Sequence, residues 1–188
     1  MHEVKKHTNE GLDTAAIRAA AKNFTDGAVT AGYQADRLDL ISMLNGALAT
    51  ELVCVLRYKR HYYTASGLQN GSIKAEFLQH AQEEQDHADQ LAERIVQLNG
   101  KPDFNPRTLS ERSHAEYDES DDIGAMIRAD LIAERIAIEH YQELVRYFGN
   151  DDPGTRSMLE GILKVEEEHA NDMHDLLVAH EGRPMLEK

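Results

Sequence analysis

The sequence predicts an all-α protein, a four-helix bundle with a long crossover between its second and third helices. Composition is one ground for this: the 188 residues include 4 Pro and no Trp, 41% are hydrophobic, and many are helix formers. Periodicity is the other, since apolar residues recur at helical spacing in four long segments, at about 36–66, 72–99, 121–149 and 152–182. A chain of this length is expected to form one domain with a sizeable core.

The first 35 residues are expected to form an extension outside the bundle, and the sequence does not indicate its role. An Ala-rich piece from Thr14 to Phe24 predicts one short helix there. The bundle is expected over residues 36–182, followed by a tail at 183–188. Asp152 and Pro153 indicate the start of the fourth helix, because Asp caps helix N-termini and Pro fits the first turn. Glycines mark the four helix ends, at Gly67, Gly100, Gly149 and Gly182.

The connections predict the topology. The first two long segments are joined by about five residues from Gly67 to Gly71, and the last two by residues 149–152, so each pair is expected to form an antiparallel hairpin. The polar connector at 100–120 reaches roughly 70 Å when extended, whereas a helix of about 28 residues is about 42 Å long. The connector can therefore run the length of the bundle and leave the second and third helices parallel.

Both halves of the chain carry the same arrangement of glutamate and histidine. A glutamate is followed, 33 residues later in one half and 32 in the other, by a Glu-x-x-His motif. The residues are Glu51, Glu84 and His87 in the first half, and Glu134, Glu166 and His169 in the second. Residues three apart lie on one face of a helix. Because each glutamate falls near the middle of its predicted helix, the six side chains are expected to meet at one level of the bundle.

A single Glu-x-x-His motif would be weak evidence. With 10 His and 19 Glu in the chain, chance alone gives roughly one such pair. The segment from Glu111 to His114 supplies one in a polar stretch without apolar periodicity, and we interpret it as a chance match. The other two lie in amphipathic segments at matched distances.

The repeat extends beyond these residues. A shift of 83 positions pairs Leu40 with Ile123, Met43 with Met126, Leu44 with Ile127, Leu48 with Leu131, Val55 with Ile138 and Tyr58 with Tyr141. For one helix, a core stripe with a glutamate at its rim would be the simpler interpretation. Four unpaired buried carboxylates would be prohibitively costly without a cation. Carboxylates with imidazoles suit iron or manganese, so the pattern predicts a dinuclear metal centre.

Charge and composition argue against some other classes of protein. The net charge of −14 disfavours a nucleic-acid partner, and residues 1–36 hold four Lys or Arg against five acidic residues, so the N-terminus is not basic. No apolar run of membrane-spanning length and no signal-peptide core are evident, so a cytoplasmic protein without a membrane partner is expected. The single Cys54 lies on the Glu51 helix and is expected to be a packed core thiol.

These residues resemble the ferritin-like superfamily, most closely the bacterioferritins and Dps-like ferritins. The likeness covers about residues 36–182. It is carried by Thr50-Glu51-Leu52-Val53, Glu84-Gln85-Asp86-His87-Ala88-Asp89, Asp130-Leu131-Ile132-Ala133-Glu134 and Glu166-Glu167-Glu168-His169.

The resemblance implies a role for each residue of the site. Glu51 and Glu134 would be terminal ligands, Glu84 and Glu166 would bridge two iron or manganese ions, and His87 and His169 would each cap one ion. Tyr58 would lie near the metals and donate an electron. An ordinary core tyrosine with a hydrogen-bonded hydroxyl is the equal alternative.

The resemblance also bears on haem and assembly. Haem is not expected, because Gln85 stands where haem-binding bacterioferritins carry methionine. The chain ends six residues past Gly182, without the short fifth helix of 24-subunit cages, which favours a homo-oligomer of about 12 copies. Leu38, Phe77 and Tyr147 are expected to be apolar residues on the outer faces.

The expected function is a ferroxidase that oxidises Fe(II) with oxygen or hydrogen peroxide, for iron storage and protection against oxidative stress. A dinuclear iron or manganese peroxidase or catalase without storage is the alternative within enzymes. A structural or DNA-protecting assembly, braced by its metals, is the alternative outside them.

Overall fold

The computed structural model describes residues 13–22, 27–66 and 70–182, and the chain divides into two units, residues 1–33 and 34–188. Within the first unit lies α1 (Thr14–Ala20), capped by the Asp13 carboxylate, which accepts the backbone N–H groups of Ala15 and Ala16 at 3.0 Å. The helix is shorter than predicted, and residues 23–26 lie outside the described part. No residue of α1 is buried, so its apolar side chains contribute no core.

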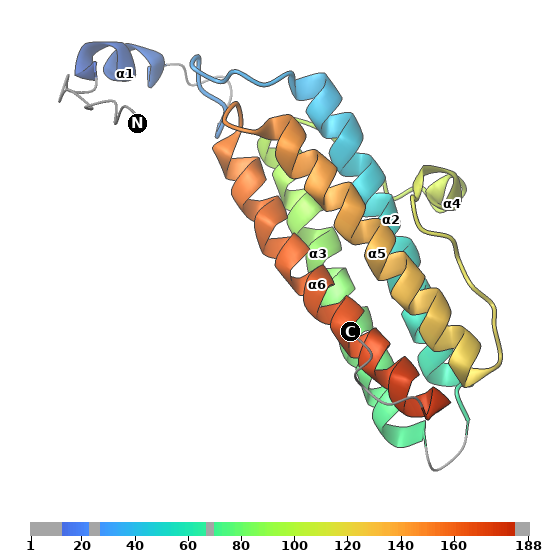
Figure 1. Ribbon diagram of the computed structural model, residues 1–188. Helices are drawn as coiled ribbons and strands as arrows, with labels where there is room; N and C mark the ends of the chain where they lie inside the picture. The colour runs from blue at the N-terminus through green and yellow to red at the C-terminus, as the bar shows by residue number, and fades with distance from the viewer. Residues whose placement is uncertain (1–12, 23–26, 67–69, 183–188) are drawn as a thin grey trace, which may run out of the picture. The chain divides into compact units, whose positions relative to one another are not determined.

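The second unit is a bundle of four long helices (Figure 1). These are α2 (Arg37–Thr64), α3 (Gly71–Gln97), α5 (Ile123–Phe148) and α6 (Pro153–Glu181). The helices α2 and α3 form one antiparallel pair and α5 and α6 the other, while α3 and α5 run in the same direction (Figure 1). The described residues form no strand. The predicted all-α bundle with its long crossover is confirmed.

Local sequence signals set the ends of these helices. Asp36, Asp122 and Asp152 cap α2, α5 and α6, each accepting backbone N–H groups of the first turn. Gly149 and Gly182 follow α5 and α6 with φ of 46° and 66°, a conformation that favours glycine. After α3 it is Asn99 that takes positive φ, one residue before the predicted Gly100. The predicted stop at Gly67 lies outside the described residues.

The crossover runs along α2 and is hydrogen-bonded to it at successive turns. The side chain of Asn45 accepts the N–H of Asp103 at 2.7 Å, and Thr50 accepts the N–H of His114 at 3.0 Å. Further along, guanidinium groups of α2 donate to crossover carbonyls: Arg57 to Glu116 at 3.2 Å, and Arg60 to Glu119 and Ser120 at 2.8 and 2.7 Å. Contacts therefore follow the same order in both segments, which shows that the crossover runs parallel to α2.

The crossover also contains one helical turn that the sequence analysis missed, α4 (Leu109–Arg112). Its Arg112 donates to the carbonyls of Asn45 and Asp103, at 3.2 and 2.9 Å. At Gly46 an added Cβ would lie 3.2 Å from the His114 ring, so glycine permits this close approach. The turn is stabilised by tertiary contacts rather than by apolar periodicity.

Apolar residues pack above and below a polar layer halfway along the bundle. One end is filled by a cluster that includes Tyr58, Phe77, Met126 and Met173. Phe77 is fully buried, so its predicted place on an outer face is wrong. It precedes Glu84 by seven residues, two helical turns, and therefore faces the core as that glutamate does. Leu38 and Tyr147 are exposed as expected, at 80% and 54%.

The helix α2 differs from expectation in its hydropathy. Its 28 residues contain an 18-residue window of mean hydropathy 1.5, long and apolar enough to cross a membrane, which the sequence analysis did not anticipate. However, 56% of that window is buried inside the bundle, and the window belongs to the helix that carries the buried Glu51. A core helix of a soluble protein has these properties. Cys54 lies on the same helix and is buried, as predicted.

Candidate metal centre

The six predicted site residues converge at the middle of the bundle. Glu51, Glu84, Glu134 and Glu166 each fall within a residue or two of the midpoint of α2, α3, α5 and α6. All four glutamates are at most 1% exposed, and His87 and His169 are 3% and 2% exposed. The apolar stripe of each amphipathic helix faces the core, and each glutamate replaces one apolar residue of that stripe.

The site divides into two overlapping groups of ligand atoms. Glu51, Glu84, His87 and Glu166 form one group, and Glu84, Glu134, Glu166 and His169 form the other. Within each group the ligand atoms lie within 4.8 Å of one another. Ligands that bind one ion at about 2.0–2.2 Å are separated by at most about 4.4 Å, so each group is close to the size of a single metal site. Only Glu84 and Glu166 belong to both groups.

Hydrogen bonding leaves free the atoms that two ions would need. Both oxygens of Glu84 and of Glu166 are buried without a hydrogen-bond partner in the structure, whereas Glu51 and Glu134 each leave one oxygen free. Nδ1 of His87 and of His169 is also without a partner, and Nδ1 of His87 approaches Glu166 to 2.7 Å without hydrogen-bond geometry. Buried polar atoms are normally satisfied. Each shared glutamate therefore has two atoms without a partner, and each of the other four residues has one. This distribution fits two cations bridged by Glu84 and Glu166.

Two tyrosines bond the remaining oxygens, each across to the other half of the repeat. The hydroxyl of Tyr58 donates to Oε1 of Glu134, and that of Tyr141 donates to Oε1 of Glu51 at 2.5 Å. Both rings are buried. Tyr58 is therefore a core tyrosine with a bonded hydroxyl that also touches a candidate ligand, and its role as an electron donor stays a prediction.

The residues around His169 were not predicted as part of the site. Nε2 of His169 bonds Oε2 of Glu83 at 2.8 Å, a contact that orients the ring and leaves Nδ1 for a metal. The ring of His80 stacks on that of His169 with centroids 3.9 Å apart, and its Nδ1 lies 3.1 Å from the Tyr58 hydroxyl. His80 stands one turn before Glu84 on α3, a spacing that places both on one face. This spacing was the available signal.

The metal-free site shares protons unequally among its carboxylates. Burial and the charge of Glu84 raise the pKa of Glu51 to about 8, and burial raises that of Glu166 well above its usual range. Burial also opposes ionisation of Glu134, but its contacts with His169 prevail and lower its pKa to about 2. The pKa of Glu84 is lowered as well, because contacts with Glu51, His169 and His87 outweigh its burial.

The carboxylates around both site histidines favour the charged form of the imidazole. Burial disfavours the charge, but contacts of His169 with Glu134 and Glu84 outweigh it and raise the pKa of His169 to about 11. Contacts with Glu166, Glu51 and Glu84 likewise raise the pKa of His87 well above its usual value. Two protonated and two ionised carboxylates then balance two imidazolium groups. Two divalent cations would preserve neutrality by displacing about four protons.

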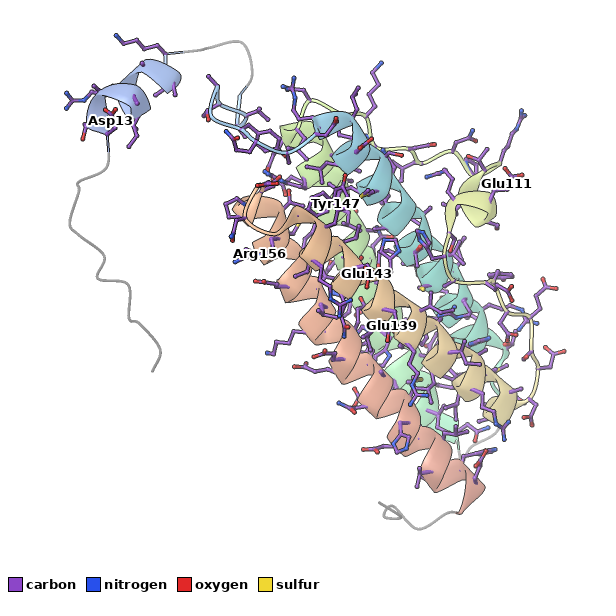
Figure 2. The ribbon with its side chains drawn as sticks, turned by 45° about the horizontal axis from the view of Figure 1, so that its top comes forward. Asp13, Glu111, Glu139, Glu143, Tyr147 and Arg156 are labelled. Atoms are coloured by element: carbon purple, nitrogen blue, oxygen red, sulfur yellow. The ribbon has the colours of Figure 1, made fainter. Side chains whose placement is uncertain are left out.

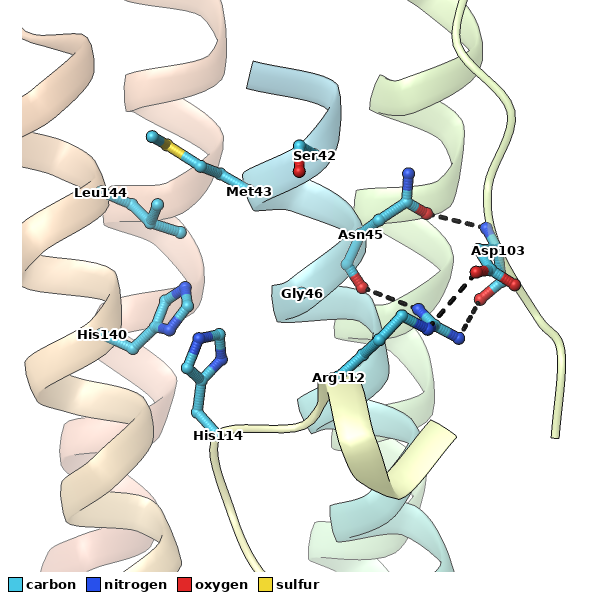
Figure 3. A pocket seen from close by; sticks show the side chains of 9 residues that line it. All are labelled: Ser42, Met43, Asn45, Gly46, Asp103, Arg112, His114, His140 and Leu144. Carbon is cyan, nitrogen blue, oxygen red and sulfur yellow. Dashed lines mark hydrogen bonds and ion pairs between the residues drawn. The ribbon is translucent and has the colours of Figure 1, made fainter. Parts of the chain in front are cut away.

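A second polar region lies outside this centre. A surface pocket of about 450 Å³ is formed by α2, α5 and the crossover. Two of its lining residues, His114 and His140, lie in edge-to-face contact with ring centroids 3.9 Å apart (Figure 3). Glu139, Glu143 and Tyr147 continue along the exposed side of α5 at intervals of four residues (Figure 2). Burial, aided by the charge of His114, lowers the pKa of His140 to about 4, so this imidazole is neutral at pH 7. Neither Glu111 nor His114 belongs to a candidate ligand group in the described part of the chain.

Comparison with known proteins places this architecture in a family. A model of the ferritin-like domain family matches residues 41–181. The nutrient stress-induced DNA-binding protein of a Synechococcus species is 32% identical over 68% of this chain and 74% of its own length. The bacterioferritin of Desulfovibrio desulfuricans is 27% identical over 74% of this chain and 75% of its own.

A solved structure agrees with these relatives. The dodecameric thioferritin of Bacteroides fragilis, a bacterioferritin-related protein, superposes with a TM-score of 0.75 at 30% identity, covering 82% of this chain and 94% of that one. The buried glutamates and histidines described above are compatible with a dinuclear site. The chain therefore belongs to the ferritin-like domain family, and its homologues are bacterioferritin and Dps proteins.

Proposed function

We propose that the protein is a ferroxidase that takes two Fe(II) ions as substrate and oxidises them with oxygen or hydrogen peroxide, for iron storage and protection against oxidative stress. The observation that supports this most strongly is the distribution of unpartnered buried atoms. Glu84 and Glu166 offer two each, while Glu51, Glu134, His87 and His169 offer one each. Oxygen ligands with two imidazoles suit iron, and manganese is the alternative metal.

Each residue has a distinct task in this proposal. The shared carboxylates of Glu84 and Glu166 hold two ions close enough for one oxidant to take an electron from each, so that radicals are not released. The helices exclude bulk water from the site, because its ligands are nearly fully buried. Tyr58 touches the Glu134 carboxylate and is the proposed electron donor.

Stopped-flow measurement of Fe(II) oxidation tests the proposal. We expect Glu84→Ala to lower the initial rate by about 100-fold or more, because both ions lose a ligand. Helix content should be preserved, because the substitution also removes one of four crowded carboxylates. Glu167→Ala is the matched control, since Glu167 is an exposed neighbour of Glu166. A wild-type rate in Glu84→Ala would overturn the assignment.

Storage separates this function from a dinuclear peroxidase or catalase. A store retains many more than two iron ions per chain, whereas a peroxidase retains only those of its active site. After aerobic loading and gel filtration, we expect iron to travel with the protein far above two per chain. Retention of only about two, with rapid peroxide turnover, would favour the peroxidase.

Assembly is the second requirement for storage. The Bacteroides fragilis relative is dodecameric, and the exposed side chains of Leu38 and Tyr147 offer apolar contacts for other copies. Twelve copies of the 21.2 kDa chain would have a mass of about 250 kDa, and twenty-four about 510 kDa. We expect mass photometry to give the smaller value. A stable monomer or dimer would contradict storage.

DNA binding is not part of the proposed function, although relatives are named for it. The net charge of −14 opposes association with a polyanion, and residues 1–36 supply no basic excess. A gel-shift experiment at low ionic strength should show no retarded DNA. A shift that disappears as salt is added would reveal a basic surface that the net charge conceals.

A further inference from the structure

Two further groups of ligand atoms lie between α3 and α6, beside the dinuclear centre, and both include His80. One consists of His80, Glu83 and His169 and shares His169 with the dinuclear centre. The other consists of Glu76, His80 and Asp172, and we call it the α3–α6 cluster. Nε2 of His80 lies 3.6 Å from Oδ2 of Asp172 and 3.9 Å from Oε2 of Glu76. His80 is fully buried, whereas the carboxylate side chains are 52% and 36% exposed. The cluster thus joins a buried imidazole to the surface.

The hydrogen bonds of Tyr58 determine which nitrogen of His80 carries the proton. The hydroxyl of Tyr58 donates its single proton to Oε1 of Glu134. The Tyr58 oxygen must then accept a hydrogen bond, and Nδ1 of His80, 3.1 Å away, is its donor. In the neutral ring this leaves Nε2 with a bare lone pair. That atom is buried and has no hydrogen-bond partner in the structure.

Apart from the His169 ring, which stacks on His80, the described residues supply no positive side chain to this lone pair. Among the residues that the structure describes, no Lys or Arg lies within 4.0 Å of Glu76 or Asp172. Glu83 is engaged by Nε2 of His169, and an ionised carboxylate has no proton to donate to this lone pair. A lone pair that faces two carboxylates is repelled by both. A divalent cation among the three groups would cancel the two negative charges and satisfy Nε2.

We propose that Glu76, His80 and Asp172 form a third cation site, which binds a divalent first-row transition metal such as Fe(II), separately from the dinuclear centre. Two carboxylates and one imidazole are a ligand set that these metals accept, with water completing the coordination. The exposed carboxylates provide entry from solvent. A cation on Nε2 makes Nδ1–H of His80 a stronger donor to Tyr58, and this chain of hydrogen bonds ends on the ligand Glu134.

Co(II) is a suitable probe, because it is stable in air and binds the same ligands. The full chain, purified without metal, should bind about three Co(II) per chain in a calorimetric titration. The double variant Glu76→Gln with Asp172→Asn should lose one ion and bind about two. Both side chains are partly exposed, so the fold should survive. The control is Glu168→Gln with Asp175→Asn, which removes the same charge from exposed positions of α6 and should still bind about three.

Anomalous diffraction from Co(II)-soaked crystals locates the ions. We expect a peak within about 2.5 Å of His80 Nε2 in the wild type and none in the double variant. The proposal is overturned if the wild type lacks this peak, if the double variant retains it, or if the ion is bound by Glu83 and His169 instead. Missing peaks between Glu84 and Glu166, with the His80 peak present, would contradict the proposed ferroxidase centre and leave the third site intact.

Discussion

The two halves of the metal centre have equivalent ligands but different surroundings. In what we call the second half-site, formed by Glu134 and His169, polar residues of α3 lie beyond the ligands. The first half-site is formed by Glu51 and His87. When α6 is aligned with α3 by a shift of 82 residues, the matching positions of α6 are apolar. Glu83, His80 and Glu76 correspond to Val165, Ile162 and Met158. No described residue hydrogen-bonds Nε2 of His87, whereas Glu83 bonds that of His169.

This difference shows that a repeated ligand set need not make two equal sites. The pKa of Glu51 is raised to about 8 by burial and the charge of Glu84, whereas contacts with His169 overcome burial and lower that of Glu134 to about 2. An ion entering the first half-site must displace a proton from Glu51, and an ion entering the second meets a carboxylate that is already ionised. We therefore expect the second half-site to fill first at neutral pH.

The largest expected consequence is a difference in pH dependence. Below about pH 8 Glu51 is protonated, so the first half-site releases one more proton per ion than the second. Each unit by which the pH is lowered should therefore reduce the metal affinity of the first half-site about tenfold more than that of the second. Co(II) titrations between about pH 6 and 7.5 measure both slopes. Equal slopes would contradict the asymmetry, and Glu51→Gln should remove the extra steepness.

The contact between Glu83 and His169 gives the next effect in size. Glu83→Gln weakens the hydrogen bond that orients His169, and we expect about tenfold weaker binding of one of the two central ions, with the other unchanged. Glu167→Gln is the matched control, because Glu167 also adjoins a shared glutamate but is exposed. Isothermal titration with Co(II) resolves the two ions. Equal weakening of both would show that Glu83 does not serve one half-site alone.

The sequence was sufficient to predict the bundle and the placement of the central residues. Heptad-like stripes in four segments determine which faces are buried, and the matched 33- and 32-residue intervals place Glu84 and Glu166 opposite Glu51 and Glu134. Their roles as ligands remain a prediction. Phe77 could also have been predicted as core, because it lies two turns before Glu84.

Other features depend on how the helices are rotated against one another. Glu76, His80 and Asp172 are polar residues at the borders of amphipathic stripes, where polar residues ordinarily face solvent. Only the contact of α3 with α6 brings them together. The turn α4 has no periodicity of its own, and its helical conformation depends on contacts of Arg112 with Asn45 and Asp103.

Substitutions of Glu51 and of Glu134 should change the stability of the metal-free protein in opposite directions. The raised pKa of Glu51 means that its contribution to stability is present below about pH 4.5 and is lost as pH rises through about 8. The lowered pKa of Glu134 means the reverse, stability present above about pH 4.5 and lost as pH falls through about 2. At about pH 8.5, Glu51→Gln should raise Tm by about 5 °C and Glu134→Gln should lower it by a similar amount. Shifts of the same sign, measured by circular dichroism without metal, would contradict the assigned protonation.

The smallest expected effect compares the two tyrosines. Tyr58→Phe leaves Glu134 without its donor and His80 Nδ1 without its acceptor, whereas Tyr141→Phe removes a partner only from Glu51. An unsatisfied buried polar group costs about 1–3 kcal/mol, so Tyr58→Phe should be the more destabilising by about 1 kcal/mol in urea unfolding. Combining Tyr58→Phe with His80→Phe removes both ends of the broken contact. If the extra loss of stability in Tyr58→Phe comes from the unsatisfied His80, it should disappear when His80→Phe is also present in a double-mutant cycle. If the loss is unchanged, it comes from Glu134 instead.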